Sequence, residues 1–506
     1  MCHGLRAGEP LSAPQPAEGL FGAPALRPGH PRSGWYYALW WWPWRSPAAA
    51  RGMRRSRRRM CPTLIHGPIR VSDIFPYRAG ELCAEEIPVS RIAAEVGTPF
   101  YLYSAAGFTA QYRRFADAFS REQPLVCFAV KANSNLAVLR HFARLGAGAD
   151  VVSEGELRRA LAAGVPPGRI IFSGVGKTAD EMRAALAAGI HQINVESVPE
   201  LRRLSEIASA EAGIARIGIR VNPDVDAHTH AKIATGRKEN KFGIELDEAV
   251  AAYRLADELP GIEPVGLAVH IGSQLTELDP YRHAFERVAE LVLELRGLGL
   301  AVSRIDLGGG IGVRYHAERQ LELTSYAKLV RENFGALGLT LAFEPGRVLC
   351  ASAGLLVARV LYVKEGSTRR FVIVDAAMND LIRPALYDAW HDIVPARLPG
   401  SGASLAPADV VGPVCETGDT FAVDRELPPF TEGDLLVFTA AGAYGAVMST
   451  TYNSRLLVPE VLVSGERFAV IRPRPSYDAL LSLDNIPEWL SAKCSTMPEE
   501  RKRGGA

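Results

Sequence analysis

The sequence predicts an α/β protein, in which a (β/α)8 TIM-like barrel is followed by a second domain made mostly of β-strands. Eight short apolar runs alternate with helical patterns between residues 107 and 352, which is typical of a barrel of parallel strands. Polar residues stand directly after these runs, where a barrel carries its chemistry. From residue 353 the pattern changes to β-like runs with few helical stretches. A chain of 506 residues that is 48% hydrophobic is long enough to bury both cores.

The predicted barrel strands are short apolar runs, as expected for strands that are buried on both faces. The stretches between them, such as residues 155–164 and 179–189, have apolar residues at helical spacing and end in glycine, which is typical of α-helices. We expect these helices to form an outer ring. The eight predicted strands span residues 124–130, 148–152, 170–173, 192–195, 216–221, 265–270, 304–308 and 340–343.

The second domain is predicted from β-like runs at residues 355–365, 369–376, 408–415 and 434–444. A further run, at residues 98–104, precedes the first barrel strand, and we expect it to join this domain. The expected division is therefore a barrel over residues 107–352, a β domain formed by residues 72–106 and 353–490, and a tail over residues 491–506.

Residues 1–71 form an extension of different composition. Residues 1–60 contain ten arginines, two acidic residues and five of the seven tryptophans. The aromatic run at residues 35–44 is too short and too rich in proline to span a bilayer, and no signal-peptide cleavage pattern follows it. A transit peptide and a basic arm that contacts membrane or nucleic acid are alternatives. We expect a disordered segment, or a segment that is never made because translation begins at Met53 or Met60.

Composition argues against several classes of function. The net charge is +1, and the excess of arginine lies in the extension, so nothing in the rest of the chain indicates nucleic-acid binding. The seven cysteines include no close pair, which fits neither a zinc site nor a disulfide framework and favours a cytoplasmic location. His228 and His230 have no third metal ligand nearby, so we expect residues 228–243 to form a loop over the site and expect no metal.

Lys131 directly follows the first predicted strand. An amine that is partly desolvated there loses its proton more readily, which a Schiff-base lysine requires. The alternative is a lysine that extends to solvent after a strand. The residues at the strand ends are Lys131, Asp150, Ser153, Ser173, Glu196, Asn222, His270, Gly308, Gly309, Gly310 and Glu344. Each could also cap the following helix, but so many polar groups at one mouth favour a binding site.

Two motifs indicate a phosphorylated pyridine cofactor. The run DLGGGIG at residues 306–312 exposes backbone amides that suit a phosphate, although tight turns also use glycine. The run EPGR at residues 344–347 brings a carboxylate to the mouth of the barrel, where this carboxylate could keep a ring nitrogen protonated. The turn formed by the proline and glycine of this run carries Arg347 inward. His270 could stack on the ring or be a partly buried structural histidine. With a Schiff-base lysine, this pattern points to pyridoxal 5′-phosphate.

Three further runs lie in the second domain, around Arg383 and Tyr387, around Cys415 and Glu416, and around Tyr444. The combination of FAVKAN, HIGSQ, DLGGGIG, EPGR, CETGD and AGAYG over residues 72–490 resembles the diaminopimelate decarboxylases. These belong to the barrel-type (fold-type III) pyridoxal-phosphate decarboxylases, which also include the ornithine and arginine decarboxylases.

The resemblance implies a role for each motif residue. Lys131 would carry the cofactor as a Schiff base, and Cys415, which could instead be a buried packing residue, would be the proton donor. A homodimer with shared sites is implied, because the CETGD turn reaches a second subunit in this family. The implied cofactor-binding residues are Lys131, His270, Ser273, Gly309, Gly310, Glu344, Pro345, Gly346, Arg347 and Tyr444. The implied substrate-binding residues are Arg347, Arg383, Tyr387, Glu416 and Tyr444.

The reaction implied is decarboxylation of a small diamino diacid, meso-2,6-diaminopimelate, to L-lysine and carbon dioxide, the last step of lysine biosynthesis. One alternative is a decarboxylase for ornithine or arginine on the same fold; two arginines near the site favour a substrate that keeps a distal carboxylate, which ornithine lacks. A second alternative is a non-catalytic homologue that binds the cofactor or a partner protein. The presence of both Lys131 and Cys415 argues against this alternative. No nucleic-acid or membrane partner is expected.

Overall fold

The computed structural model describes residues 73–226 and 241–491. The extension before residue 73, most of the predicted loop over the site with His228 and His230, and the tail after residue 491 lie outside the described residues. Among the described residues, no helix is long and apolar enough to cross a membrane.

The first domain is a closed barrel of eight parallel strands, so this part of the prediction is confirmed. Closure comes from the pairing of β8 with β9, and the two-residue strand β10 (Ile244–Glu245) adds to β9 outside the barrel. The barrel strands are β5 (Leu125–Ala129), β6 (Gly148–Val151), β7 (Ile170–Phe172), β8 (Gln192–Val195), β9 (Ala215–Asn222), β11 (Ile262–Val269), β12 (Arg304–Asp306) and β13 (Thr340–Phe343).

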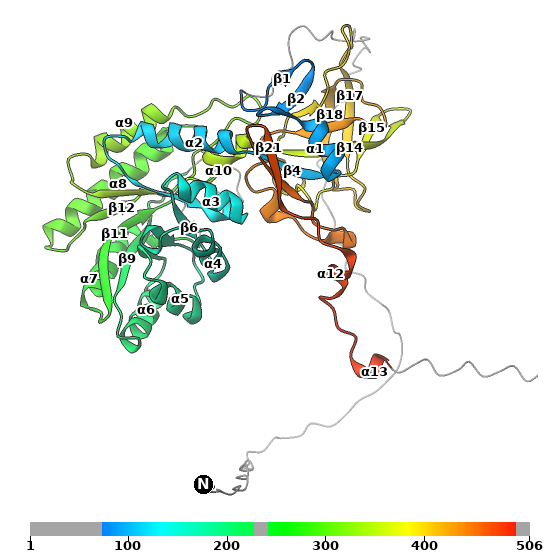
Figure 1. The fold of residues 1–506 in the computed structure, drawn as a ribbon. Coiled ribbons are helices and arrows are strands. Elements are labelled where there is room, and N and C mark those ends of the chain that lie inside the picture. The colour runs from blue at the N-terminus through cyan, green and yellow to red at the C-terminus, as the bar shows by residue number, and fades with distance from the viewer. Residues whose placement is uncertain (1–72, 227–240, 492–506) are drawn as a thin grey trace, which may run out of the picture. The chain divides into compact units, whose positions relative to one another are not determined.

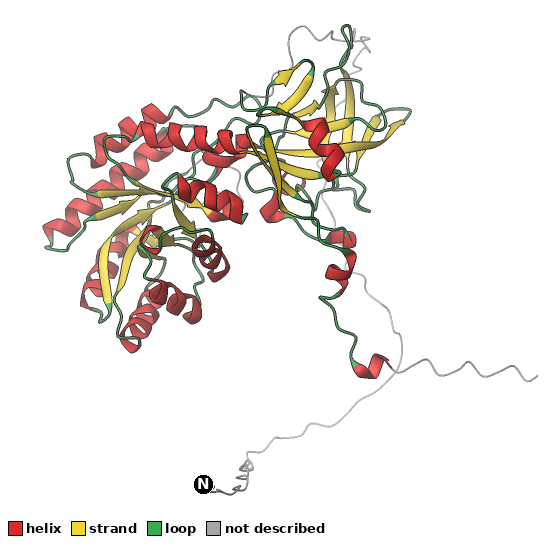
Figure 2. Ribbon diagram, viewed as in Figure 1, coloured by secondary structure: helices red, strands yellow, loops and turns green. Residues whose placement is uncertain are grey.

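Helices surround these strands, as Figure 2 shows in red. Several begin at a serine or threonine that follows a strand; Ser153 and Ser197 each accept a hydrogen bond from the backbone N–H three residues later. Ser153, one of the polar strand-end residues, is therefore a helix cap. The helices are α2 (Ala105–Ala118), α3 (Leu136–Arg144), α4 (Glu154–Ala162), α5 (Ala179–Ala188), α6 (Val198–Ala210), α7 (Leu246–Glu258), α8 (Asp279–Gly297), α9 (Leu323–Phe334) and the short α10 (Arg347–Cys350).

The second domain is built mostly of β-strands, as predicted (Figure 1). Its early strand β4 (Phe100–Ser104) lies between β14 and β20, antiparallel to the first and parallel to the second. The remaining strands are β14 (Gly354–Glu365), β15 (Arg370–Val374), β16 (Ile393–Pro395), β17 (Ala406–Val411), β18 (Thr420–Leu427), β19 (Leu435–Phe438), β20 (Glu460–Ser464) and β21 (Arg467–Arg472). Smaller elements are β1 (Tyr77–Arg78), β2 (Glu81–Ala84), β3 (Ile87–Pro88), α1 (Val89–Val96), α11 (Arg383–Tyr387), α12 (Tyr477–Leu481) and α13 (Glu488–Ser491).

Hydrogen bonds between the two domains position the loop that carries Tyr444. The backbone N–H of Tyr444 donates to the carbonyl of Ala132 (2.8 Å), next to Lys131. The side-chain amide of Asn133 donates to the carbonyl of Gly442 (3.2 Å). Both asparagine and loop are buried, so these bonds are shielded from water and hold Tyr444 against the mouth of the barrel.

Candidate active site

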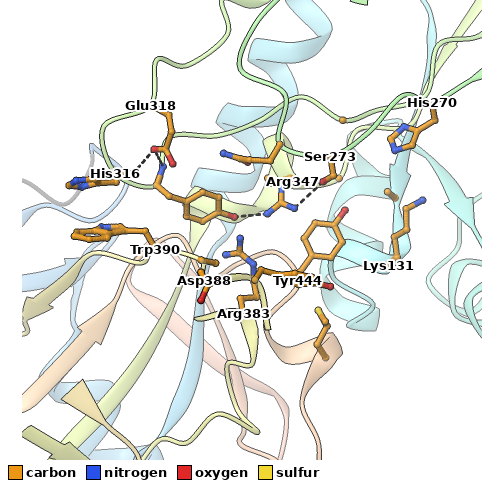
Figure 3. Close-up of a pocket in the computed structure, with 18 of the residues that line it drawn as sticks. Lys131, His270, Ser273, His316, Glu318, Arg347, Arg383, Asp388, Trp390 and Tyr444 are labelled. Atoms are coloured by element: carbon orange, nitrogen blue, oxygen red, sulfur yellow. Dashed lines mark hydrogen bonds between the residues drawn. The ribbon is translucent and has the colours of Figure 1, made fainter. Parts of the chain in front are cut away.

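A cavity of about 580 Å³ lies at the C-terminal ends of the barrel strands, and residues of the second domain form part of its wall. It brings together ten of the predicted site residues: Lys131, His270, Ser273, Gly310, Glu344, Gly346, Arg347, Arg383, Tyr387 and Tyr444. Figure 3 shows Lys131 and His270 at one end, His316 and Trp390 at the other, and two arginines between them. Residues 200 or more positions apart in sequence therefore share one cavity.

Lys131 stands in the 3-10 turn Val130–Ala132, immediately after β5. Its amine donates to the carboxylate of Asp150 at the end of β6. Burial lowers the pKa of Lys131, but the charges of Asp150 and Glu344 raise it by more, so the net shift is upward. The expectation that this amine loses its proton readily is therefore wrong for the protein alone, because the strand ends bring carboxylates to it.

Glu344 follows β13 and is buried beneath the mouth. Its Oε1 accepts hydrogen bonds from the hydroxyl of Ser173 (3.0 Å) and the amide of Asn194 (3.4 Å). Burial, then the charges of Asp150 and Asp306, raise the pKa of Glu344 well above its usual range. A buried carboxyl of this kind is best satisfied by a cationic partner.

The glycine run after β12 has a backbone that only glycine fits. Gly308 and Gly310 have φ values of +63° and +93°. A Cβ on Gly309 would lie 2.3 Å from the carbonyl oxygen of Glu344, and one on Gly310 would lie 2.4 Å from that of Gly272. Gly310 lines the cavity, whereas Gly309 and Pro345 lie beside it. The run therefore allows a ligand to approach the backbone closely.

His270 ends β11 and lines the cavity. Its Nδ1 accepts a hydrogen bond from the backbone N–H of Gly309 (3.2 Å), which links the ring to the glycine run. Burial, then the charges of Arg220 and Lys131, lower the pKa of His270 well below its usual value. A neutral imidazole can lie against an aromatic ring without the cost of burying a charge.

These groups fit pyridoxal phosphate. The buried Oδ1 of Asp150 has no hydrogen-bond partner among the described residues, so a polar group remains to be satisfied beside the Lys131 amine. Lys131 would meet the aldehyde carbon of the cofactor. The buried carboxyl of Glu344 would meet its ring nitrogen, and the glycine run would meet its phosphate. All three open on the same cavity.

Arg347 and Arg383 are buried in the middle of the cavity. Arg347 donates to the hydroxyls of Tyr315 (2.8 Å) and Ser273 (3.0 Å), and its guanidinium lies 4.7 Å from the centre of the Tyr444 ring. Arg383 hydrogen-bonds to His391 (2.7 Å) and lies 4.5 Å from the centre of the Tyr315 ring. Neither forms an ion pair with a carboxylate in the described part of the chain.

Arg383 is held by a neutral histidine. Burial, then the charge of Arg383, lower the pKa of His391 to about 3. The Nδ1–H of His391 donates to the carbonyl of Thr439 (2.7 Å), which leaves Nε2 to accept from Arg383. Two buried cations without an anionic partner among the described residues are chemically suited to a carboxylate.

Cys415 and Glu416 do not line this cavity. Both are exposed, in a turn ordered by Asp419, whose carboxylate accepts the backbone N–H groups of Met378 (2.6 Å) and Val414 (2.7 Å). The thiol is therefore exposed on a turn that these hydrogen bonds order, and the alternative of a buried packing cysteine is wrong.

Sequence reasoning missed part of the cavity wall. Tyr315 contacts both buried arginines, yet no spacing or motif distinguishes it beyond its position shortly after the glycine run. His316 and Trp390 stack with ring centres 3.9 Å apart and close the far end. The lining residues not predicted are Ala129, Gln274, Tyr315, His316, Glu318, Asp388, Ala389, Trp390 and Met448.

A sequence model of the pyridoxal-binding domain of pyridoxal-dependent decarboxylases matches residues 105–351. Together with the closed barrel and the lysine at the end of its first strand, this match defines the class: the chain is a barrel-type pyridoxal-dependent decarboxylase, and its cofactor is pyridoxal phosphate.

Relatives define the family within this class. Diaminopimelate decarboxylase from Pseudomonas aeruginosa is 53% identical over 415 residues, which cover 82% of this chain and 99% of the relative. The structure of diaminopimelate decarboxylase from Helicobacter pylori complexed with L-lysine aligns with a TM-score of 0.75 at 43% identity, covering 78% of this chain and 98% of that chain. The structure from M. jannaschii in complex with L-lysine gives a TM-score of 0.78 at 35% identity, covering 83% and 99%. The chain belongs to the diaminopimelate decarboxylase family.

Proposed function

We propose that the protein decarboxylates meso-2,6-diaminopimelate to L-lysine and carbon dioxide with pyridoxal phosphate as cofactor. The observation that carries this proposal is the pair of buried guanidinium groups, Arg347 and Arg383, in the same cavity as Lys131. A substrate that loses one carboxylate at the cofactor and keeps another needs a cationic site at a distance from Lys131. Ornithine has no second carboxylate and would leave both arginines unpaired, at a cost of about 1–3 kcal/mol or more for a buried polar group.

The residues of the chain divide the work of the reaction. When bound, the cofactor supplies an electron sink for the carbon that loses carbon dioxide. Lys131 would attach the cofactor, and Glu344 would hold a proton at its ring nitrogen. Arg347 and Arg383 bind the carboxylate that is retained, and Tyr444 and Tyr387 close the wall around the substrate. With the retained carboxylate bound by the two arginines, the substrate would be held in one orientation, with the other carboxylate at the Lys131 end of the cavity.

We infer that the active unit is a homodimer, in which the exposed turn of Cys415 and Glu416 enters the site of the partner subunit. Two observations support this: the thiol is exposed, and the cavity of its own chain does not include it. The thiol of Cys415 would then give its proton to the carbon from which carbon dioxide has left, and the product would be L-lysine. Glu416 would bind the distal amino group.

We propose the cytoplasm as the compartment, because the exposed Cys415 must stay reduced to give a proton.

The test is release of carbon dioxide by the purified protein with pyridoxal phosphate, measured with meso-diaminopimelate, ornithine, arginine and lysine at equal concentrations. We expect kcat/KM for diaminopimelate to exceed that for every other substrate by at least about 30-fold, the factor that corresponds to about 2 kcal/mol. A higher kcat/KM for ornithine or arginine would contradict the proposed substrate. No release from any of them would support a non-catalytic homologue.

A further inference from the structure

A second buried carboxyl lies beneath Glu344. Asp306 ends β12 inside the barrel and is almost completely shielded from solvent. The side-chain amide of Asn194 contacts both carboxyl groups, at Asp306 Oδ2 (2.9 Å) and at Glu344 Oε1 (3.4 Å), so the two groups lie side by side. Two neighbouring carboxyl groups in a buried site do not both ionise, so the pair holds a proton inside the barrel.

Donors around the pair set where its negative charge lies. Asp306 accepts the amide of Asn194 at Oδ2 (2.9 Å) and the backbone N–H of Gly308 at Oδ1 (2.9 Å). Glu344 receives the hydroxyl of Ser173 (3.0 Å) and a longer contact from Asn194 (3.4 Å). With one good donor on each oxygen, Asp306 is the better site for the charge, and Glu344 is the better site for the proton.

On the basis of the cofactor site proposed above, we propose that Asp306 is a positioning residue that acts through Glu344 to keep a proton at the ring nitrogen of the bound cofactor up to alkaline pH. The negative charge of Asp306 is buried and next to Glu344, so it stabilises a proton shared between Glu344 and the ring nitrogen. Without that charge, the same proton leaves at lower pH.

The other charged and titratable groups facing the pair do not replace Asp306. Asp150 and Lys131 face Glu344 from β6 and from the turn after β5, and they form an ion pair with each other. Cys127 and Tyr326 face Asp306 from β5 and α9, and burial raises the pKa of both, so both stay neutral. Asp306 therefore differs from Asp150 in carrying a negative charge that no cation pairs among the described residues.

The experiment is an NMR titration of the holoenzyme with a cofactor labelled with nitrogen-15 at the ring, which reports directly whether the ring nitrogen is protonated. In Asp306→Asn we expect loss of the proton to move to lower pH by about one unit or more, a tenfold change in the equilibrium. In Ser173→Ala, which removes a donor to the charged form of Glu344, we expect the opposite shift, to higher pH. Tyr326→Phe removes a buried hydroxyl with no partner among the described residues and serves as the control that should not shift.

A purely structural role for Asp306 would lower the melting temperature without moving the titration, and that result would overturn the proposal. If Asp306→Asn does not fold, the deciding measurement is the titration of the ring nitrogen in Ser173→Ala, which should move to higher pH. An unchanged titration in Ser173→Ala would also overturn the proposal. The titration needs no substrate. A protein that shows these shifts but does not decarboxylate diaminopimelate would therefore refute the proposed substrate and leave the role of Asp306 standing.

Discussion

At the scale of single residues, the site depends on charges that the fold holds out of water. Lys131 and Asp150 form an ion pair at neighbouring strand ends, and Arg347 and Arg383 lie buried with aromatic and neutral partners. Each of these groups is costly to bury alone, so we expect a ligand group to complete the site at each of them.

The Lys131→Ala variant should lose the visible absorbance of the attached cofactor, because no other predicted site residue offers an amine. We expect circular dichroism to show an intact fold, with a lower melting temperature because Asp150 is left buried without its partner. Lys328→Ala, on the surface of α9, is the matched control and should keep the absorbance. Unchanged absorbance in Lys131→Ala after dialysis would mean that another lysine holds the cofactor.

The Arg383→Ala variant should lower kcat/KM for diaminopimelate by about 30-fold or more, equivalent to about 2 kcal/mol, because a charge-assisted hydrogen bond to the retained carboxylate is lost. Most of the loss should appear in KM. Arg397→Ala removes an exposed arginine that pairs with Glu81 and should leave both constants unchanged. Wild-type kinetics in Arg383→Ala would remove this residue from the site.

At the scale of elements, the glycine run after β12 is the most constrained segment of the site. Its turn passes within contact distance of the backbone of Glu344 and Gly272, so the ends of β12, β13 and β11 are held together without intervening side chains. The loop carrying Tyr444 is held by a backbone hydrogen bond to Ala132, next to Lys131, and by a hydrogen bond from the side chain of Asn133.

A methyl group in this segment should disturb both the fold and the cofactor site. Gly310→Ala places a Cβ 2.4 Å from the carbonyl oxygen of Gly272 at a φ of +93°, so we expect a cost of about 1–3 kcal/mol and weaker cofactor binding in equilibrium dialysis. Gly297→Ala, near the end of α8 with open space around it, should be neutral or stabilising by up to about 1 kcal/mol. Equal cofactor affinity in Gly310→Ala would show that the turn has room to adjust.

At the scale of the whole molecule, the role proposed for Cys415 needs a second copy of the chain, because the thiol is exposed. The cavity that holds Lys131 contains no cysteine among its lining residues, and two backbone N–H groups that donate to Asp419 order the turn of Cys415. A shared site of this kind makes activity depend on assembly.

Mixing two inactive variants tests this dependence. Lys131→Ala and Cys415→Ala, unfolded together and refolded, should give mixed dimers in which one site has both residues intact. With random pairing, half of the dimers are mixed, so about a quarter of wild-type activity should return. The control mixes Lys131→Ala with Lys131→Ala,Cys415→Ala, in which no site is complete. Activity no higher than the sum of the separate variants would contradict the shared site.

Much of this protein was determined by local sequence alone. Each barrel strand is a run of apolar residues that needs burial on both faces, and each such run formed a strand where it was predicted. The glycine run and Lys131 were likewise visible, because backbone conformation and strand-end position depend on the residues nearby. The family resemblance used the same local motifs.

Only the tertiary structure decided how these parts act on one another. The upward pKa shift of Lys131 comes from Coulomb interactions with Asp150 and Glu344, and that of Glu344 comes from burial and from the charges of Asp150 and Asp306 on other strands. The aromatic contacts of Tyr315 with Arg347 and Arg383 join the loop after the glycine run to α10 and α11. Electrostatic energy depends on distance and on burial, and neither is written in local sequence, so these properties belong to the fold.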